Sequence, residues 1–576
     1  MLRFHGTVRS SRVALSGLLS LSLAACGGGG SGSSNTTSPP ASTVTFSVNT
    51  KSLQFTATGA NDATPASQAI TATVTGNPTG TLYVLVNANG DAVSQVGNIV
   101  ISGNSGQGSV SVKPPSLVGV GSHTSTITIR ACLNDQTCTT GQLSGSPQAV
   151  NVTYTVNATP VADTVMPHTL AAGISGQIIV RGHGLMGVTS VAFGSTPATS
   201  LSVVSDSELH VNYPSTLPAG TYPVSLNGGA IAFSGTVAVV ATPAFSAQTL
   251  TFPEQPTRLL EMVYDAERGA LFVAAAFSQS GNNKLWRYTY SGGAWSASPQ
   301  VIPIPDLRDI TFSADHSRLL VSTSFTLTEY DATNPAAGAL KTLASIPSAS
   351  SVTTPFFKML ALSNDGNIII NSGEISVSGD LDAYLYSAAT GTIAPFANFS
   401  ALLYSLGDDN VSTIRASADG SHVFGINGGG SPASKALIYT TATQVFMQAP
   451  FTAGSGYEQR VALDSSASKV AVYTNTGMSV YDSSNKLLGS ISIAPLVFVI
   501  NPQGTRAYAF TFDRFLIAYD LTSATGGSAL AQVGASVSQQ LPTANEAAVI
   551  LSAISPDGAT IFLASDAGIA VVPAPL

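Results

Sequence analysis

The chain has 576 residues, of which only 9% are charged and 44% are hydrophobic, and it contains 54 Gly and 31 Pro. Ordinary globular proteins carry about 25% charged residues, so hydroxyl and amide groups must supply much of the polar surface here. The formal net charge of −8 and the lack of a basic run argue against nucleic acid as a partner. Short β-branched runs separated by Gly and Pro predict an all-β chain, long enough for three or four domains.

The N-terminus has the pattern of a secretory signal. Arg3, Arg9 and Arg12 precede a short apolar segment, residues 13–25, which ends in the small residues Ala24 and Ala25. A basic start, a short apolar run and small residues at the cleavage point are typical of a signal peptide. The run is shorter than the roughly 20 apolar residues that a membrane span needs. Residues 1–25 are therefore predicted to be removed, which lowers the formal net charge from −8 to −11.

The sequence Leu23-Ala-Ala-Cys26 resembles the lipobox of bacterial lipoproteins. The resemblance implies that Cys26 carries the lipid, palmitate among its acyl chains, and becomes the mature N-terminus. Each buried methylene contributes about 0.8 kcal/mol, so several acyl chains anchor a protein durably. Gly27 follows the cysteine where inner-membrane lipoproteins have Asp, which implies an outer-membrane lipoprotein, periplasmic or surface-exposed. The alternative is an ordinary secreted protein with an incidental cysteine.

Residues 26–43 are rich in Gly, Ser, Thr and Pro and are predicted to form a flexible tether. Besides Cys26 the chain has two cysteines, Cys132 and Cys138, with five residues between them. In an oxidising compartment this spacing favours a disulfide. A metal site is disfavoured, because no second Cys pair or nearby His completes four ligands. The short loop predicts a modest stabilisation of about 2 kcal/mol.

Residues 44–157 contain six short alternating or apolar runs at the spacing of a β-sandwich. They resemble a bacterial immunoglobulin-like domain, although the Cys-Trp-Cys core signature is missing. The resemblance implies a spacer or an adhesion module, and the spacer is favoured because neither aromatic nor charged residues concentrate in the strands.

Residues 159–241 resemble the IPT/TIG family of immunoglobulin-like domains. The resemblance rests on the Gly-x-Gly corner at Gly182 and Gly184, on Phe193-Gly194 at a strand end, and on residues 219–222, Ala-Gly-Thr-Tyr, at the start of a late strand. The glycine-rich corner is not interpreted as a nucleotide loop, because no helix follows it. Three histidines of this segment are scattered and are interpreted as surface or edge residues rather than ligands: His168, His183 and His210.

From residue 243 to residue 576 the sequence repeats a unit of three or four apolar strands with an acidic or Gly-containing turn after the first. The seven turns recur every 48 residues on average and lie at Glu267, Asp315, Asp365, Asp419, Ser466, Gln503 and Asp557. Four-stranded blades of this period are typical of β-propellers. The Ser-Pro-Asp-Gly type of turn resembles the YVTN and WD-like seven-bladed bacterial propellers. The predicted fold is therefore all-β, with two immunoglobulin-like sandwiches followed by a seven-bladed β-propeller.

The last blade lacks its outer strand within the sequence. We expect residues 248–252 to pair with residues 568–572 and so to close the ring. Strand order also places the Asp-Gly turns on one face and the longer loops on the other. Loops on a rigid scaffold are the usual place for binding, and the candidate ligand face comprises Arg308, Asp309, Lys358, Asp408, Asp409, Tyr457, Glu458 and Arg460. The alternative is that these are solvated surface charges.

Three function classes remain open. The first is a non-catalytic envelope lipoprotein whose propeller binds a protein or glycan partner and is held off the membrane by two immunoglobulin-like spacers. The second is a propeller enzyme of lactonase or hydrolase type, and the third is an envelope assembly scaffold. The propeller segment contains only His316 and His422, both in or beside the Asp-Gly turns. Binding is favoured because no catalytic residues, metal ligands or cofactor motifs are apparent in the sequence.

Overall fold

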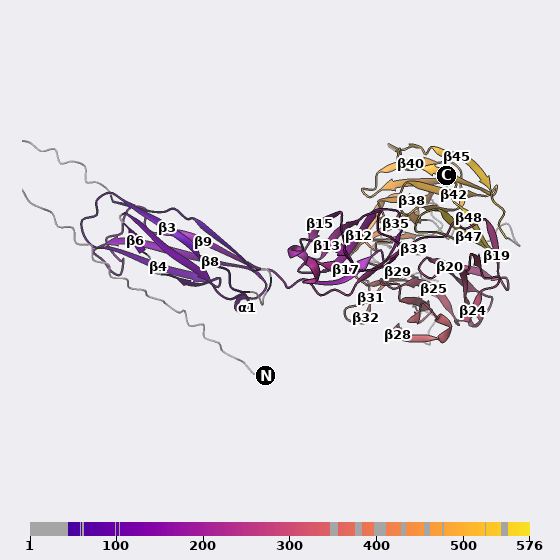
Figure 1. The fold of residues 1–576 in the computed structure, drawn as a ribbon, viewed down its shortest axis with the longest axis horizontal. Coiled ribbons are helices and arrows are strands. Elements are labelled where there is room, and N and C mark those ends of the chain that lie inside the picture. The colour runs from indigo at the N-terminus through magenta and orange to yellow at the C-terminus, as the bar shows by residue number, and fades with distance from the viewer. Residues whose placement is uncertain are drawn as a thin grey trace, which may run out of the picture. The chain divides into compact units, whose positions relative to one another are not determined.

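The structure is a computed structural model that describes residues 44–575 except 58, 60–62, 98–99, 103, 346–354, 375–382, 397–410, 428–433, 454–460, 475–476, 525 and 543–550. Strands dominate the described residues, so the predicted all-β class is confirmed. The chain separates into two compact units, of which the first ends at Pro160 and the second begins at Val161 (Figure 1).

The first unit contains a two-layer sandwich, called here the first sandwich. One sheet has the order β1-β3-β7-β5, with β6 also paired to β7: β1 (Thr45–Val48), β3 (Gln68–Thr75), β5 (Val93–Val96), β6 (Val100–Ser102) and β7 (Ser105–Val112). The other has the order β2-β9-β8-β4: β2 (Ser52–Ala57), β4 (Leu82–Gly90), β8 (Gly121–Leu133) and β9 (Gln148–Val156). A short helix, α1 (Pro115–Val118), precedes β8. Alternate residues of both sheets form one core, which includes Phe46, Ile127 and Tyr154.

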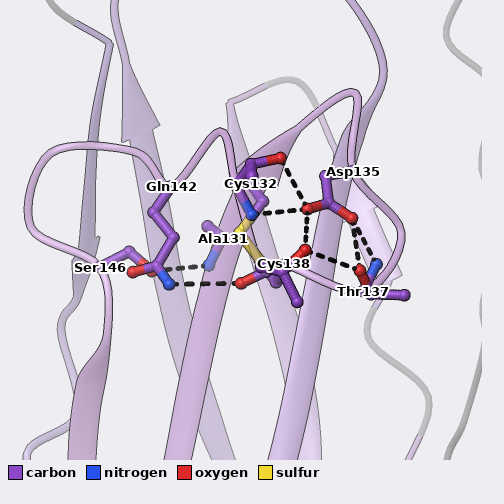
Figure 2. The surroundings of a disulfide bond; sticks show 9 residues. Ala131, Cys132, Asp135, Thr137, Cys138, Gln142 and Ser146 are labelled. Carbon is purple, nitrogen blue, oxygen red and sulfur yellow. Dashed lines mark hydrogen bonds between the residues drawn. A yellow bond between two sulfur atoms is a disulfide. The ribbon is translucent and has the colours of Figure 1, made fainter.

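Cys132 and Cys138 form a disulfide at the end of β8, with their Cα atoms 5.5 Å apart, as the sequence predicts (Figure 2). The loop between them is ordered by Asp135, whose carboxylate accepts hydrogen bonds from the backbone N–H groups of Thr137 (2.9 Å) and Thr140 (2.6 Å). These bonds, with those from nearby threonine hydroxyls, hold the pKa of Asp135 well below its usual value. The bridge therefore closes a small loop that is stiffened by its own polar contacts.

The second unit begins with another sandwich, called here the second sandwich. One sheet has the order β10-β12-β16-β15: β10 (Val161–Met166), β12 (Gly176–His183), β15 (Ser200–Ser205) and β16 (Glu208–Tyr213). The other has the order β11-β18-β17-β13-β14: β11 (Thr169–Ala171), β13 (Val191–Phe193), β14 (Thr196–Pro197), β17 (Gly220–Leu226) and β18 (Thr236–Val240). Two 3-10 turns lie beside them, η1 (Leu185–Gly187) and η2 (Asn227–Gly229). The shared core includes Ile178, Phe193 and Val237.

In the rest of the second unit the described residues form seven sheets, numbered here in chain order. Sheet 1 comprises β20 (Arg258–Asp265), β21 (Ala270–Ala276), β22 (Lys284–Ser291), β23 (Ala294–Trp295) and β24 (Gln300–Pro303), and the 3-10 turn η3 (Ser280–Asn282) precedes β22. Sheet 2 comprises β25 (Leu307–Phe312), β26 (Arg318–Thr323), β27 (Thr326–Asp331) and β28 (Ala339–Ser345), and the 3-10 turn η4 (Pro335–Ala337) precedes β28. Sheet 3 comprises β29 (Pro355–Leu362), β30 (Ile368–Glu374), β31 (Ala383–Ser387) and β32 (Thr392–Pro395).

Sheets 4 to 7 follow the same order of strands. Sheet 4 comprises β33 (Val411–Ala416), β34 (His422–Asn427), β35 (Ser434–Thr440) and β36 (Val445–Ala453), and sheet 5 comprises β37 (Val461–Leu463), β38 (Lys469–Thr474), β39 (Gly477–Asp482), β40 (Leu487–Ile491) and β44 (Ser528–Ala529). Sheet 6 comprises β41 (Pro495–Ile500), β42 (Arg506–Thr511), β43 (Phe515–Asp520) and β45 (Gln532–Ser538). Sheet 7 comprises β46 (Leu551–Ile554), β47 (Thr560–Ser565), β48 (Gly568–Pro573) and β19 (Gln248–Thr251).

The first strands of these sheets contact one another in a closed cycle, β20-β25-β29-β33-β37-β41-β46, and β46 contacts β20 again. The seven sheets therefore surround a centre, and we call them the ring. Its closure follows the sequence prediction, because β19 pairs antiparallel with β48, with Leu250 opposite Ile569. Sheet 7 is thus completed by a strand that comes before sheet 1 in the chain.

The turns between first and second strands hydrogen-bond from one sheet to the next, and we call this side of the ring the turn face. Asn364 donates its N–H to the carbonyl of Gly420 (2.9 Å), and Asp419 donates to Ser465 (2.9 Å). Gly420 has a φ of +64°, and a Cβ there would lie 2.5 Å from the nitrogen of Asn364, so only glycine fits. The prediction that these turns share one face is confirmed.

Candidate functional site

The structure describes only part of the predicted ligand face. Arg308 and Asp309 lie in β25, and Lys358 lies in β29, although the sequence placed all three in loops. The other predicted ligand-face residues fall outside the described residues, as does the predicted lipidation site: Asp408, Asp409, Tyr457, Glu458, Arg460 and Cys26.

Arg308 and Asp309 are neighbours in β25, but a β-bulge leaves Arg308 out of the strand pairing in which Asp309 takes part. The pairing of β25 with β26 shifts between Leu307 and Asp309, which leaves Arg308 as the extra residue. The guanidinium of Arg308 remains one-third exposed and bonds Ser324 Oγ and Asp306 Oδ1, each at 3.0 Å. In sheet 3 the pairing shifts at the same place, and Lys358 is the extra residue. The two bulges place Arg308 and Lys358 at equivalent backbone positions in neighbouring sheets.

Asp309 is buried, with 2% of its surface exposed, so the expectation that it belongs to a surface loop is wrong. Its Oδ2 accepts a hydrogen bond from the N–H of Leu360 in sheet 3 (2.7 Å), and its Oδ1 accepts one from Ile310 (2.8 Å). Burial, together with repulsion from Glu261, raises the pKa of Asp309 well above its usual value despite the opposing effect of Arg415. Asp309 therefore joins sheets 2 and 3 at the centre of the ring.

A cavity of about 740 Å³ lies at the centre of the second unit. Its walls are the first strands of the ring and the turns that follow them. Residues 166–167, 169–171 and 174–177 of the second sandwich, with Tyr213, also line the cavity, so this sandwich covers part of the turn face. That contact was not predicted from the sequence.

An ion pair crosses the cavity between sheets 1 and 4. Arg415 Nη1, from β33, lies 2.5 Å from Glu261 Oε2, from β20, and it also donates to the carbonyl of Ile414 (3.3 Å). Glu261 is fixed in turn, since its Oε1 accepts the N–H of Met262 at 2.9 Å. Burial acts to lower the pKa of Arg415, but Glu261 and Asp309 outweigh it and raise that pKa. The guanidinium is therefore charged and held in one orientation.

The second sandwich meets the ring through buried residues. Met166 packs into the hydrophobic cluster of sheets 2 and 3, which includes Leu320 and Leu362. Arg181, on β12, donates from Nε to Asn364 Oδ1 on the turn face at 2.9 Å, and its Nη2 lies 2.6 Å from Glu208 Oε2. Arg181 and Glu208 are 7% and 6% exposed, and Glu208 Oε1 also lies 2.5 Å from His210 Nε2, so loss of Arg181 would leave a buried carboxylate with only His210 as its side-chain partner.

Two histidines share one carboxylate at the same interface. Glu267 Oε1, in the turn after β20, accepts a hydrogen bond from Thr169 Oγ1 (2.5 Å) and lies 3.2 Å from His316 Nδ1 and 3.5 Å from His168 Nε2. Burial acts to raise the pKa of Glu267, but these partners outweigh it and hold that pKa well below its usual value. His168 is 5% exposed, so its interpretation as a surface or edge residue is wrong.

The described residues contain no group of three His, Cys, Asp or Glu side chains arranged to hold a metal ion. Among the described residues, no helix is both long and apolar enough to cross a membrane. Comparison with known protein families finds no model that matches the chain, and comparison with curated proteins finds no significant match.

Proposed function

We propose that the chain is an outer-membrane lipoprotein, anchored through Cys26, whose seven-bladed β-propeller binds a protein or glycan partner without catalysing a reaction. The anchor is supported by the N-terminal sequence alone. The propeller is supported by the closed cycle of seven sheets and by the pairing of β19 with β48. The two sandwiches, each with two facing sheets around one core, support two immunoglobulin-like domains.

The observation that carries the binding role is the arrangement of charged side chains at the centre of the ring. Two carboxyl groups next to Arg415 are engaged: Glu261 pairs with Arg415, and Asp309 accepts hydrogen bonds from two backbone N–H groups. A general base needs a carboxylate that can reach a substrate proton, whereas a recognition site needs side chains held in place. The rigid ion pair fits recognition better.

The partner is proposed to approach the rim of the ring where Arg308 and Lys358 lie at equivalent bulges. The test is a crosslinking pulldown from intact envelopes with the full-length protein and with the double variant Arg308→Ala/Lys358→Ala. We expect the captured protein or polysaccharide to be lost in the double variant and retained in Lys341→Ala, whose side chain is exposed on the outer strand β28. Equal capture by all three proteins would overturn the proposed binding rim, and a soluble turnover product would favour an enzyme instead.

The anchor is tested separately with Cys26→Ser. We expect the parent protein to incorporate labelled palmitate and to fractionate with the outer membrane, and the variant to lose both properties. Palmitate incorporation that is unchanged in the variant would refute lipidation at Cys26, whatever the pulldown shows.

A further inference from the structure

We propose that the central cavity is a binding site for a neutral, hydroxyl-rich small molecule of sugar size, with the unused edge of the Arg415 guanidinium as its main hydrogen-bond donor. The proposal rests on the proposed function, because it names a ligand class for the same ring, but it concerns the cavity rather than the rim. It is argued from the donors that Arg415 leaves unused, from the charge of the cavity and from the residues of its wall.

The guanidinium of Arg415 has N–H groups that donate to no described protein atom. A guanidinium has five N–H donors in a fixed planar fork, and within the described part of the chain only Nη1 of Arg415 donates to protein atoms. The side chain is 25% exposed and lines the cavity, and no described protein atom accepts a hydrogen bond from Nε or Nη2. Glu261 fixes the plane of the fork, and a donor pair held in this way recognises two neighbouring oxygens on a ligand.

The charges around the cavity oppose an anionic ligand. The positive charge of Arg415 is balanced by Glu261, and burial favours the neutral form of Asp309 by raising its pKa. The wall on the turn side adds two further carboxyl groups, Asp419 and Asp464. Burial raises the pKa of Asp464, and Asp419 adds to that effect. With no cation left unbalanced, a carboxylate or phosphate ligand would meet net repulsion, whereas a neutral ligand would not.

The remaining wall is partly apolar and partly made of polar side chains that can bind hydroxyl groups. Side-chain hydroxyls and amides from both the ring and the second sandwich line the cavity, namely Thr311, Ser465, Ser466, Gln503 and Gln177. These groups both donate and accept hydrogen bonds, as the hydroxyls of a sugar do. The cavity volume of about 740 Å³ lies within the range of small-molecule sites, about 300–1,000 Å³. Vicinal hydroxyls, with two oxygens side by side, match the free edge of Arg415.

The test uses ligand-observed NMR and calorimetry on the full-length protein in detergent. The probes are two matched pairs, glucose with glucuronate and galactose with galacturonate, which differ in one carboxylate. We expect at least one neutral sugar to bind and its acidic counterpart to bind at least tenfold more weakly. Absence of binding by both neutral sugars, or equal or tighter binding of the acids, would overturn the proposal.

The decisive variant is Arg415→Lys, which keeps the positive charge beside Glu261 but lacks the planar fork. We expect it to fold, as judged by an unchanged melting temperature, and to bind the neutral sugar at least tenfold more weakly. Lys341→Met is the matched control and should bind as the parent does. Full binding by Arg415→Lys would refute the role of Arg415. The two proposals fail separately, because Arg308 and Lys358 do not line the cavity: the double variant Arg308→Ala/Lys358→Ala should lose the envelope partner and still bind the neutral sugar.

Discussion

The two sandwiches have the same two-sheet architecture but differ in how far the outer faces of their strands are buried. In the first, β2 alternates strictly between exposed and buried residues, and the paired ions His123 and Asp91 include a well-exposed carboxylate. In the second, four consecutive residues of β12, Ile178 to Arg181, are all buried. A strand that is buried on both faces has a second partner beyond its own core. The difference shows that the second sandwich is a fixed part of the ring unit.

The difference between the sandwiches is tested most directly by removal of Arg181, the buried cation at the interface between the second sandwich and the ring. Arg181→Met leaves buried Glu208 with His210 as its remaining side-chain partner and leaves Asn364 without the Arg181 bond. Loss of one member of a buried pair costs about 3–5 kcal/mol, and because His210 remains we expect the lower end, about 3 kcal/mol. We expect the melting transition of the second unit to fall by the equivalent of this amount, while the transition of the first unit stays in place. Differential scanning calorimetry of the full-length protein measures both.

Arg130→Met is the matched control, because Arg130 is exposed on β8 of the first sandwich. We expect it to change stability by no more than about 0.5 kcal/mol, as for most surface substitutions. Similar losses in both variants would mean that the Arg181 interface contributes nothing specific to the stability of the second unit.

A hydrophobic substitution probes the same interface without a change of charge. Met166→Ala empties a site in the cluster of sheets 2 and 3, and such deletions cost about 2–5 kcal/mol. Met186→Ala serves as its control, because Met186 belongs to the same sandwich but is 59% exposed. Chemical denaturation should show the loss for Met166 alone. Equal effects of the two substitutions would show that Met166 does not join the sandwich to the ring.

The sequence predicted the parts of the fold that depend on local pattern. The spacing of the turns predicted the seven repeated sheets. The spare strand at residues 248–252 predicted how the ring closes, because the last sheet otherwise has an unpaired edge. The disulfide followed from the spacing of Cys132 and Cys138. Each of these features is set by residues close together in the chain or by a repeat that can be counted.

The cavity and the docked sandwich could not be predicted in the same way, because they depend on residues far apart in the chain. Arg415 and Glu261 lie 154 residues apart, with two sheets between them in the chain, and nothing in their local sequence pairs them. One signal was available for the interface: the run Gln177-Ile-Ile-Val-Arg181 lacks the alternation of a half-exposed strand. The β-bulge at Arg308 contains no glycine or proline, so no sign of it was visible in the sequence.

The disulfide offers a contrasting perturbation that should be confined to the first unit. The double substitution Cys132→Ser/Cys138→Ser opens a short loop, and we expect a loss of about 2 kcal/mol. Only the transition of the first unit should move in calorimetry, since the bridge lies wholly within it. Reduction of the parent protein with dithiothreitol should reproduce the shift. A shift in the second unit would contradict the separation of the two units.

The smallest predicted effect is a pH dependence at the interface. His422 begins β34 and bonds Ser421 Oγ through Nδ1 (2.8 Å), while Asp419, Glu208, His210 and Arg181 line the same small pocket. Burial lowers the pKa of His422 from its ordinary value of 6.5, although Asp419 and Glu208 oppose this.

Because the folded pKa of His422 is lowered, the unfolded chain binds the proton more readily, and stability should fall as the pH drops below about 6.5. The contribution of Glu267, whose folded pKa is lowered from 4.5, is lost only at still lower pH and does not interfere. We therefore expect the melting temperature of the second unit to fall between pH 7.5 and pH 5.5, and to fall less in His422→Asn. His183→Asn is the control, because its side chain is 59% exposed and should leave the pH slope unchanged. If His422→Asn kept the full slope, proton uptake at this interface would not be its cause.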